Sequence, residues 1–228
     1  MNFKTLLKAL TLVASSCAVV MAGPVTLADT TADYSGTQGG NGWSYGYFQF
    51  PGTAFTTTGY TFGDSFGGWW ALGTTGASNY EFQGPSSKMH PGYDASTSTQ
   101  YDTVREYTDS TYTGAVDISG LIQKVDAADP AQTITATIYL NGTSIYSYVL
   151  AGDNQVGQTF DVGATLNMGD KLDFAVSTGV ATSTIGNDLT IFQSTITETT
   201  ATPEPATFLG AGALLVSLSL IRRRRTAR

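Results

Sequence analysis

Cysteine and histidine are scarce in this chain of 228 residues. The one cysteine, Cys17, lies near the N-terminus, and the one histidine is His90. A single cysteine excludes a disulfide framework within the chain. One cysteine and one histidine also exclude the ligand sets that are typical of structural zinc. The stability of the folded protein therefore has to come from core burial and from strand pairing.

Basic residues are scarce as well, and they are concentrated at the two ends of the chain. Seven of the 11 bases lie before residue 9 or after residue 221, whereas 17 of the 18 acids lie in residues 29–198. The region between the basic ends therefore has a formal charge of −13. Such a region repels phosphate backbones and anionic headgroups, which excludes nucleic acid and anionic membrane surfaces as partners. The charge favours solubility, divalent cations or a neutral ligand.

The first 22 residues have the pattern of a secretory signal peptide. Two lysines precede an apolar run over residues 9–21, and small residues favour cleavage after Ala22. A lipoprotein interpretation would centre on Cys17, but the apolar run continues past it. We therefore expect an N-terminal signal helix, followed by a flexible, glycine-rich segment over residues 23–42.

The C-terminus combines three elements in a fixed order. Pro203, Glu204 and Pro205 come first, and their fixed φ angles stop a helix from continuing backwards. An uncharged apolar run over residues 207–221 follows; as a helix at about 1.5 Å per residue it is roughly 22 Å long, shorter than an ordinary membrane span. A basic tail over residues 222–228 ends the chain. Its four consecutive cations are Arg222, Arg223, Arg224 and Arg225. Cations beside a span resist translocation, so this end stays in the cytoplasm and the domain before it lies across the membrane.

This arrangement over residues 203–228 resembles the PEP-CTERM sorting signal of Gram-negative bacteria, which has a Pro-Glu-Pro motif, a short transmembrane helix and a basic tail. The resemblance implies a partner, a membrane exosortase that processes the chain near residues 203–205. It also implies export, transient anchoring in the inner membrane, and delivery to the cell surface or the extracellular space. The family is associated with exopolysaccharide and biofilm material. The alternative is a C-terminal anchor that is never cut.

Short strand-like runs fill the region between these signals, and no helical periodicity is seen. Alternation of large and small residues predicts a strand over residues 43–50. Further strands are expected over residues 101–107, 112–118, 158–162, 171–177 and 189–196. Residues 85–100, which include His90, are interpreted as a long polar loop, and residues 198–202 as a Thr-rich linker.

The clearest local signal is a β-hairpin. Residues 132–140 and 143–150 both alternate polar and apolar side chains, and Asn141 and Gly142 connect them. Both central residues of a type I′ turn need a positive φ, which asparagine and glycine adopt readily. The pattern therefore predicts two antiparallel strands joined by a two-residue turn.

Together these signals predict an all-β fold, an antiparallel, jelly-roll-like β-sandwich over residues 43–197. The second half also resembles a β-sandwich module that is common in secreted bacterial proteins and similar in outline to carbohydrate-binding jelly rolls. The runs that carry this resemblance are residues 104–105, 113–120, 138–142 and 169–176. The resemblance implies no defined ligand.

The sequence selects no set of catalytic residues. A Ser-His-Asp triad would have to use His90, whose position beside Pro91 and Gly92 favours a loop-packing role. Paired carboxylates act on glycosidic bonds, but no spacing here selects a pair. The candidates by number alone are Asp64, Asp94, Asp102, Glu106, Asp161, Asp173 and Asp188. We therefore predict no catalytic residue and no cofactor. A structural Ca²⁺ is compatible with the acidic composition, without assignable ligands.

The aromatic side chains are the most suggestive feature. An exposed ring offers a flat apolar face to a sugar, with polar neighbours for its hydroxyl groups. The candidate ligand surface consists of Trp43, Tyr45, Tyr47, Trp69, Trp70 and His90. Because adjacent strand residues point to opposite faces, one of Trp69 and Trp70 is expected to be exposed. The alternative is that these rings form the core of the sandwich.

The sequence thus predicts a non-catalytic surface or extracellular-matrix protein that is sorted by its tail and binds polysaccharide. One alternative is a small jelly-roll polysaccharide lyase or hydrolase, and another is a purely structural matrix protein without a ligand. The exposure of the three tryptophans distinguishes between binding and purely structural roles. Three buried indoles favour the structural role, and an exposed row favours binding.

Overall fold

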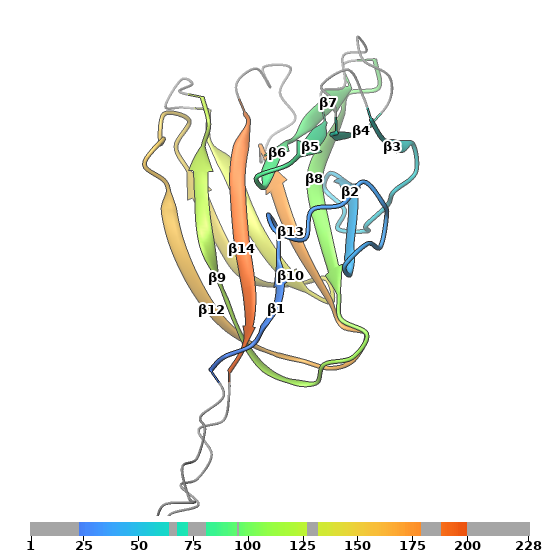
Figure 1. Cartoon of the computed structure of the whole chain (residues 1–228). Helices are drawn as coiled ribbons and strands as arrows, with labels where there is room; N and C mark the ends of the chain where they lie inside the picture. Colours follow the sequence, from blue (N-terminus) through green and yellow to red (C-terminus); the bar gives the residue numbers. More distant parts are fainter. Residues whose placement is uncertain are drawn as a thin grey trace, which may run out of the picture. The chain divides into compact units, whose positions relative to one another are not determined.

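Two antiparallel β-sheets face each other and enclose an apolar core (Figure 1). This computed structural model describes residues 23–63, 68–72, 81–94, 96–126, 132–178 and 188–199. Residues Val25–Thr199 form one compact unit. The predicted signal helix, sorting motif, C-terminal helix and basic tail all lie outside the described residues. Within the described ranges, no helix is long and apolar enough to cross a membrane.

The first sheet has eight strands in the order β12-β9-β14-β6-β5-β4-β3, and β1 also pairs with β14. These strands are β1 (Thr26–Asp29), β3 (Tyr60–Phe62), β4 (Trp70–Leu72), β5 (Phe82–Gly84), β6 (Lys88–His90), β9 (Gly114–Lys124), β12 (Gln158–Leu166) and β14 (Thr190–Glu198). The second sheet has six strands in the order β11-β10-β13-β8-β2, and β7 also pairs with β8. These strands are β2 (Trp43–Gln49), β7 (Gly92–Asp94), β8 (Thr99–Thr108), β10 (Ile134–Leu140), β11 (Thr143–Leu150) and β13 (Lys171–Ser177).

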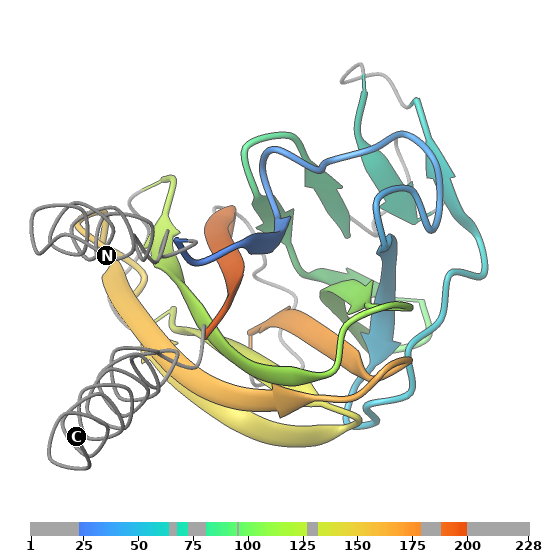
Figure 2. The same ribbon diagram turned by 60° about the horizontal axis from the view of Figure 1, so that its bottom comes forward.

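The chain alternates between the two sheets over its second half. Strands β8, β10, β11 and β13 belong to the second sheet, whereas β9, β12 and β14 belong to the first. Figure 2 shows β9 and β12 on the opposite side of the unit from the short strands β3 and β4. The alternating chain path places strands from distant parts of the sequence on both sides of one core.

The predicted all-β class with antiparallel sheets is confirmed. The predicted hairpin appears as β10 and β11, which pair antiparallel from Ile134 opposite Leu150 to Leu140 opposite Thr143. Asn141 has a φ of 50° and Gly142 a φ of 77°, the positive values that the turn requires. Strand β13 has the predicted bounds, and β8, β9, β12 and β14 overlap the runs predicted for them.

Two segments that were expected to lack regular structure contain strands. Strand β1 lies inside the predicted flexible segment of residues 23–42 and pairs with β14 over Thr195–Thr197. Strands β6 and β7 lie inside the predicted polar loop of residues 85–100. Each of these strands has only three or four residues, too few to show a period of two, and each exists because a longer neighbour supplies hydrogen bonds.

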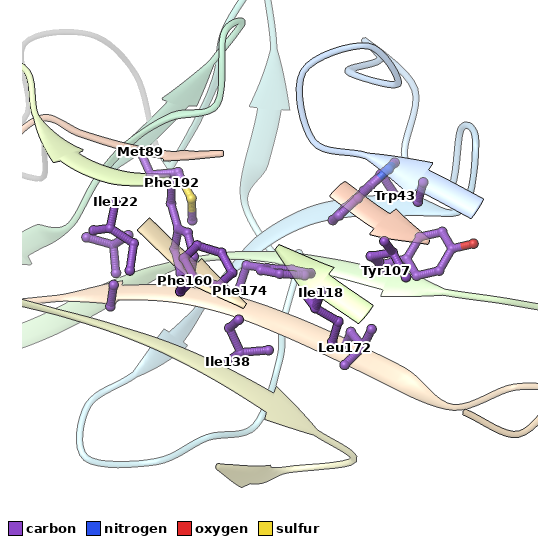
Figure 3. Packing of buried hydrophobic residues seen from close by; sticks show 14 of the residues in the cluster. Trp43, Met89, Tyr107, Ile118, Ile122, Ile138, Phe160, Leu172, Phe174 and Phe192 are labelled. Carbon is purple, nitrogen blue, oxygen red and sulfur yellow. The ribbon is translucent and has the colours of Figure 1, made fainter. Parts of the chain in front are cut away.

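The core consists of the inward-facing side chains of both sheets. Figure 3 shows Phe160 and Phe192 from the first sheet close to Phe174 from the second, and Trp43 beside Tyr107. The ring centroids of Phe174 and Phe192 are 5.6 Å apart at an interplanar angle of 80°, an edge-to-face contact between the sheets. Aromatic burial of this kind supplies cohesion that the cysteine-poor sequence cannot obtain from disulfides.

A polar cluster around Arg105 crosses the core beside these rings. Arg105 is fully buried on β8, and its Nε donates to Gln83 Oε1 on β5 at 3.1 Å. Gln83 Nε2 in turn donates to the Val104 carbonyl at 3.0 Å. The guanidinium also lies over the rings of Tyr34 and Tyr45, with centroid distances of 5.3 and 5.8 Å. These contacts fix β5 of the first sheet against β8 of the second.

Candidate functional site

Most of the predicted ligand surface belongs to the core. Trp43, Tyr45 and Trp70 are 1%, 1% and 5% exposed, and the Tyr45 and Trp70 rings stack 5.4 Å apart. Tyr47 is half-buried and contacts the same core. Its hydroxyl donates to the Thr58 carbonyl. The proposal that Trp43, Tyr45 and Tyr47 form an exposed binding face is therefore wrong, because that face of β2 turns toward the first sheet.

His90 does not lie in a loop. It ends β6, is 7% exposed, and stacks its ring on Phe82 at 4.7 Å. Its Nδ1 lies 2.7 Å from the Pro91 carbonyl oxygen. Because a carbonyl oxygen only accepts, Nδ1 carries the proton in this contact. The expected packing role of His90 is thus observed, on a strand rather than in a loop.

Trp69 is the one predicted aromatic residue that lies on an outward face and is half-buried. It directly precedes β4, so it points away from the core while Trp70 points into it. A Cβ atom built on Gly84 would lie almost equally close to three atoms of the six-membered indole ring, which places that position over the ring face. The indole therefore lies flat on Gly84 of β5, and its opposite face turns away from the sheet.

Two further rings extend this arrangement. The Phe82 ring meets Trp69 edge-on at 5.3 Å and 64°, and His90 stacks on Phe82. We call Trp69, Phe82 and His90 the aromatic ledge. It lies on the outward face of the first sheet, because Gln83 and Met89, the alternate residues of β5 and β6, are fully buried.

The ledge continues into a cross-strand row, which we define as Trp69, Gly84, Lys88, Ile191 and Gln123. Gly84 pairs with Lys88, Lys88 with Ile191, and Ile191 with Gln123, so the row crosses β5, β6, β14 and β9. Its four side chains are all half-buried. At about 4.8 Å per strand, four spacings make the row roughly 19 Å long. That length accommodates several sugar units of an extended chain.

The backbone under the ledge is held from inside the protein. The Arg105 guanidinium donates from Nη2 to the carbonyls of Gly84 at 2.6 Å and of Lys88 at 3.2 Å. The same group donates from Nη1 to the Thr30 carbonyl at 2.8 Å. Charge-assisted hydrogen bonds of this kind are stronger than neutral ones. The backbone of the row is therefore held in place before any ligand binds. This reduces the conformational entropy that the protein would lose on binding.

The candidate carboxylates do not all converge on one site, although Glu106 and Asp173 are neighbours. Asp102, Glu106 and Asp173 all lie on the outward face of the second sheet, where Asp173 pairs with Glu106 across β13 and β8. Asp188 is buried against Lys124 at 3.0 Å, inside the protein. The remaining members are Asp94, which accepts from Ser96 in a turn, Asp161, which is exposed on β12, and Asp64, which lies outside the described residues.

Burial changes the acidity of two of these groups. Desolvation raises the pKa of Asp173 to about 7, and the neighbouring Glu106 carboxylate adds to that rise. Desolvation likewise raises the pKa of Asp102 to about 6. Asp102 lies opposite Phe48 and Asp173 lies opposite Tyr139, and these two rings meet edge-on at 5.7 Å in a cluster with Val104 and Ala175. This outward face is thus a small second core rather than an open cleft.

A buried glutamate that the sequence did not single out directly precedes β5. Glu81 is fully buried, and Tyr60 donates its hydroxyl to Glu81 Oε1 at 2.7 Å. Burial raises the pKa of Glu81 well above its ordinary value, which favours the protonated acid. No sequence signal marks it, because its burial depends on residues of other strands, Gly92 of β7 and Thr103 of β8.

Residues 63–67, Gly-Asp-Ser-Phe-Gly, match the Gly-x-Ser-x-Gly pattern of hydrolase nucleophiles. That pattern needs a strand before the serine and a helix after it. Here β3 precedes the pattern and β4 follows, and the two strands pair antiparallel with Phe62 opposite Trp70. The context is a pair of short strands, although residues 64–67 themselves lie outside the described part. The described flanks of the pattern are therefore two short paired strands, with no helix directly after it among the described residues.

No group of three or more His, Cys, Asp or Glu residues in the described ranges is arranged to hold a metal ion.

Comparison with known proteins identifies no family. No family model matches the chain, and no curated protein matches it. Among solved structures, a family 35 carbohydrate-binding module from Clostridium thermocellum is 11% identical with a TM-score of 0.32, covering 77% of this chain and 98% of that one. The GH26-CBM35 β-(1,4)-mannanase of Podospora anserina is 17% identical with a TM-score of 0.34. This match covers 80% of this chain and 29% of that one. The carbohydrate-binding module CBM36 in complex with calcium and xylotriose is 14% identical with a TM-score of 0.25. This match covers 42% of this chain and 71% of that one. At these scores, none of them defines the function of this chain.

Proposed function

We propose that this protein is exported, is sorted by its C-terminal tail, and acts outside the cell as a non-catalytic, jelly-roll-like domain that binds polysaccharide through the aromatic ledge. One observation carries the binding proposal. The half-buried Trp69 indole lies on the outward face of the first sheet, flat on Gly84 and edge-on to Phe82.

The chemistry of this face fits a sugar. The C–H groups of a pyranose ring pack against the flat indole, and neighbouring polar groups exchange hydrogen bonds with its hydroxyl groups. Lys88 and Gln123 supply such polar groups along the cross-strand row. Because the row runs perpendicular to the strands, it favours an extended chain over a single small molecule.

Packing of the one histidine supports a binding role rather than catalysis. The imidazole of His90 is stacked on Phe82 and directs Nδ1 to a backbone carbonyl. Asp188, another catalytic candidate, is already neutralised by Lys124. A general acid or base has to reach a reacting atom of the substrate, and neither group is placed to do so.

Replacing Trp69 by alanine is expected to weaken binding of the preferred polysaccharide about tenfold or more, because the stacking surface is lost. The full-length chain and the Trp69→Ala variant would be compared on a glycan array and then by affinity electrophoresis. Phe50→Ala is the matched control, since Phe50 is 38% exposed and lies outside the ledge. Equal binding by wild type and Trp69→Ala would contradict the proposal.

A purely structural matrix role is the second candidate, and it is favoured by the burial of Trp43 and Trp70. It predicts that the folded protein binds no glycan on the array. Tryptophan fluorescence provides an independent readout of binding. Stacking on Trp69 would change the emission of the half-buried indole, and Trp69→Phe would remove that change while leaving the signals of the two buried indoles.

The sorting proposal rests on the sequence of residues 203–228. Changing Pro203, Glu204 and Pro205 to alanine is expected to leave the chain uncut and associated with the inner membrane. Mass spectrometry of the membrane and extracellular fractions measures this directly. A Thr197→Ala variant, altered in the strand that precedes the motif, serves as the control for processing. Release of the triple variant at the wild-type rate would show that the motif is not recognised.

A further inference from the structure

Strand β11 forms one edge of the second sheet. It comes last in the strand order, and among the described residues it pairs with β10 alone. An edge strand directs about half of its backbone N–H and C=O groups away from its single neighbour. With eight residues, β11 is long enough for a further strand to pair along it.

Strand β11 carries few of the features that stop an edge from pairing. Proteins protect edge strands with lysine, proline, inward-pointing charges, bulges or short length. Residues 143–150 contain no charged residue and no proline. The one irregularity in register with β10 lies near the turn, and the pairing is regular from Tyr146 to Leu150. The strand therefore presents a regular, uncharged edge.

The other edges of the two sheets are protected in the ways that β11 is not. At the opposite end of the second sheet, Tyr47 of β2 exchanges two backbone hydrogen bonds with Thr56, at 3.0 and 3.1 Å. Strands β1, β3 and β7 have only three or four residues. Strand β12 is long, but it carries the exposed Asp161. Among the described strands, β11 is thus the long edge that lacks a charge.

Apolar side chains reach the surface along this edge. Val149, on the outward face of β11, is 59% exposed. Tyr146 and Tyr148 pack against the core from the inner face, yet both remain half-buried. The Tyr146 ring also meets Phe160 of β12, with centroids 5.2 Å apart. A further strand on this edge would cover these side chains and supply the apolar part of an interface.

Charge limits where two copies of this domain can meet. Its formal charge of −13 makes most contacts between copies repulsive. Neither β10 nor β11 carries a charged residue, and the nearest acids along the chain, Asp129 and Asp153, lie beyond the ends of this hairpin. Asp173 of β13 is two strands away from β11 and only 5% exposed. The β11 edge therefore opposes the approach of a second copy less than the acidic parts of the domain do.

We propose that β11 pairs antiparallel with β11 of a second copy of this chain, which joins the two second sheets into one continuous sheet. Two-fold symmetry makes such a contact self-complementary. Because Tyr146 and Tyr148 share the inner face and Ser147 and Val149 the outer face, a reversed copy aligns like side chains on each face. Pairing along the whole strand would add about eight hydrogen bonds between the copies. The contact does not involve the aromatic ledge.

The test is the oligomeric state of the full-length chain, measured by analytical ultracentrifugation in a mild detergent over a range of protein concentrations. Wild type is expected to change from monomer to dimer as its concentration rises. A double variant with Ser147→Lys and Val149→Lys should raise the dissociation constant of the dimer about tenfold or more, because like charges would meet across the joined strands. The matched control places two lysines on the exposed face of β12, by Thr159→Lys and Thr165→Lys, and should still form the dimer.

Hydrogen exchange of the wild-type chain gives a second readout that needs no variant. Amides of residues 143–150 that face the edge should exchange more slowly as the protein concentration rises, whereas those of residues 158–166 should not change. A wild-type chain that stays monomeric, or exchange in residues 143–150 that does not depend on concentration, overturns the proposal. It is also overturned if the β11 lysines leave the dimer intact, or if the β12 lysines weaken it equally.

Discussion

Replacing Arg105 by methionine is expected to lower the free energy of unfolding by about 3 kcal/mol or more. The guanidinium is fully buried and donates to Gln83 Oε1 and to the carbonyls of Thr30 and Gly84. Methionine fills a similar volume but donates no hydrogen bond. Each acceptor would lose its charged donor inside the protein, where water cannot replace it. Urea unfolding followed by tryptophan fluorescence measures the effect.

The matched control for this prediction is Lys171→Met. Its Nζ also contacts a carboxylate, Glu106, but the lysine side chain is 52% exposed, so the pair is screened by solvent. We expect a change below about 1 kcal/mol. Arg105→Lys should fall between the two, because one ammonium cannot reach acceptors on three sides. An Arg105→Met variant as stable as wild type would show that the polar cluster contributes nothing to stability.

The second large effect is a loss of stability as the pH rises from about 4.5 to about 8. Free aspartate titrates near pH 4, whereas in the folded protein the pKa of Asp102 is raised to about 6 and that of Asp173 to about 7. A raised pKa means that the folded state holds its proton more tightly than the unfolded state. The stability from these protons is therefore complete below about pH 4 and is lost as the pH rises through 6 and 7. At about 1.4 kcal/mol per pKa unit, the combined loss is several kcal/mol.

Asp173→Asn isolates the larger of the two contributions. The amide cannot ionise, so it keeps the packing of the protonated acid at every pH. The variant is expected to unfold at a higher urea concentration than wild type near pH 8 and at a similar one near pH 5. The control is Asp161→Asn, which changes an exposed aspartate on β12. If Asp173→Asn unfolds with the same pH dependence as wild type, then Asp173 is not the group that titrates.

Other carboxylates limit how far lowering the pH can stabilise the folded protein. Hydrogen bonds to backbone amides and to Thr195 hold the pKa of Asp29 below its ordinary value against the effect of burial, and backbone amides do the same for Asp109. Groups of this kind lose their contribution when they are protonated, so stability falls again below about pH 4. We therefore expect a maximum near pH 4 to 5.

Local chemistry was sufficient to predict the long strands and one turn. Asn141 and Gly142 determine their turn without help from distant residues, because both adopt positive φ. Strands β10 and β13 show clear alternation, and both have seven residues. Strands β5 and β6 have only three residues each, and they exist because β14 and Arg105 hold them in place. No window of the sequence around them contains that information.

The site was less predictable than the fold, for a related reason. Alternation separates the two faces of a strand, but it does not say which face another sheet covers. Trp43 and Trp69 both follow a glycine, yet the Trp43 side chain points toward the other sheet and the Trp69 side chain points away from the core. What distinguishes Trp69 is Gly84, 15 positions along the chain, whose missing side chain leaves room for the indole. That relation appears only once β4 and β5 pair.

The pairing of β14 also determines how the domain would bear a mechanical load. Strand β6, which carries Lys88, pairs with the start of β14 at Thr190 and Ile191, whereas the chain leaves the domain at the other end, after Glu198. A pull between a polysaccharide on the ledge and a tether at that end would run along the strand axis. It would load the nine register pairs between β14 and β9 in shear, all at once, rather than peel them apart one after another. The register between β14 and β9 therefore favours resistance to a load applied along β14, between the ledge and the C-terminal end of that strand.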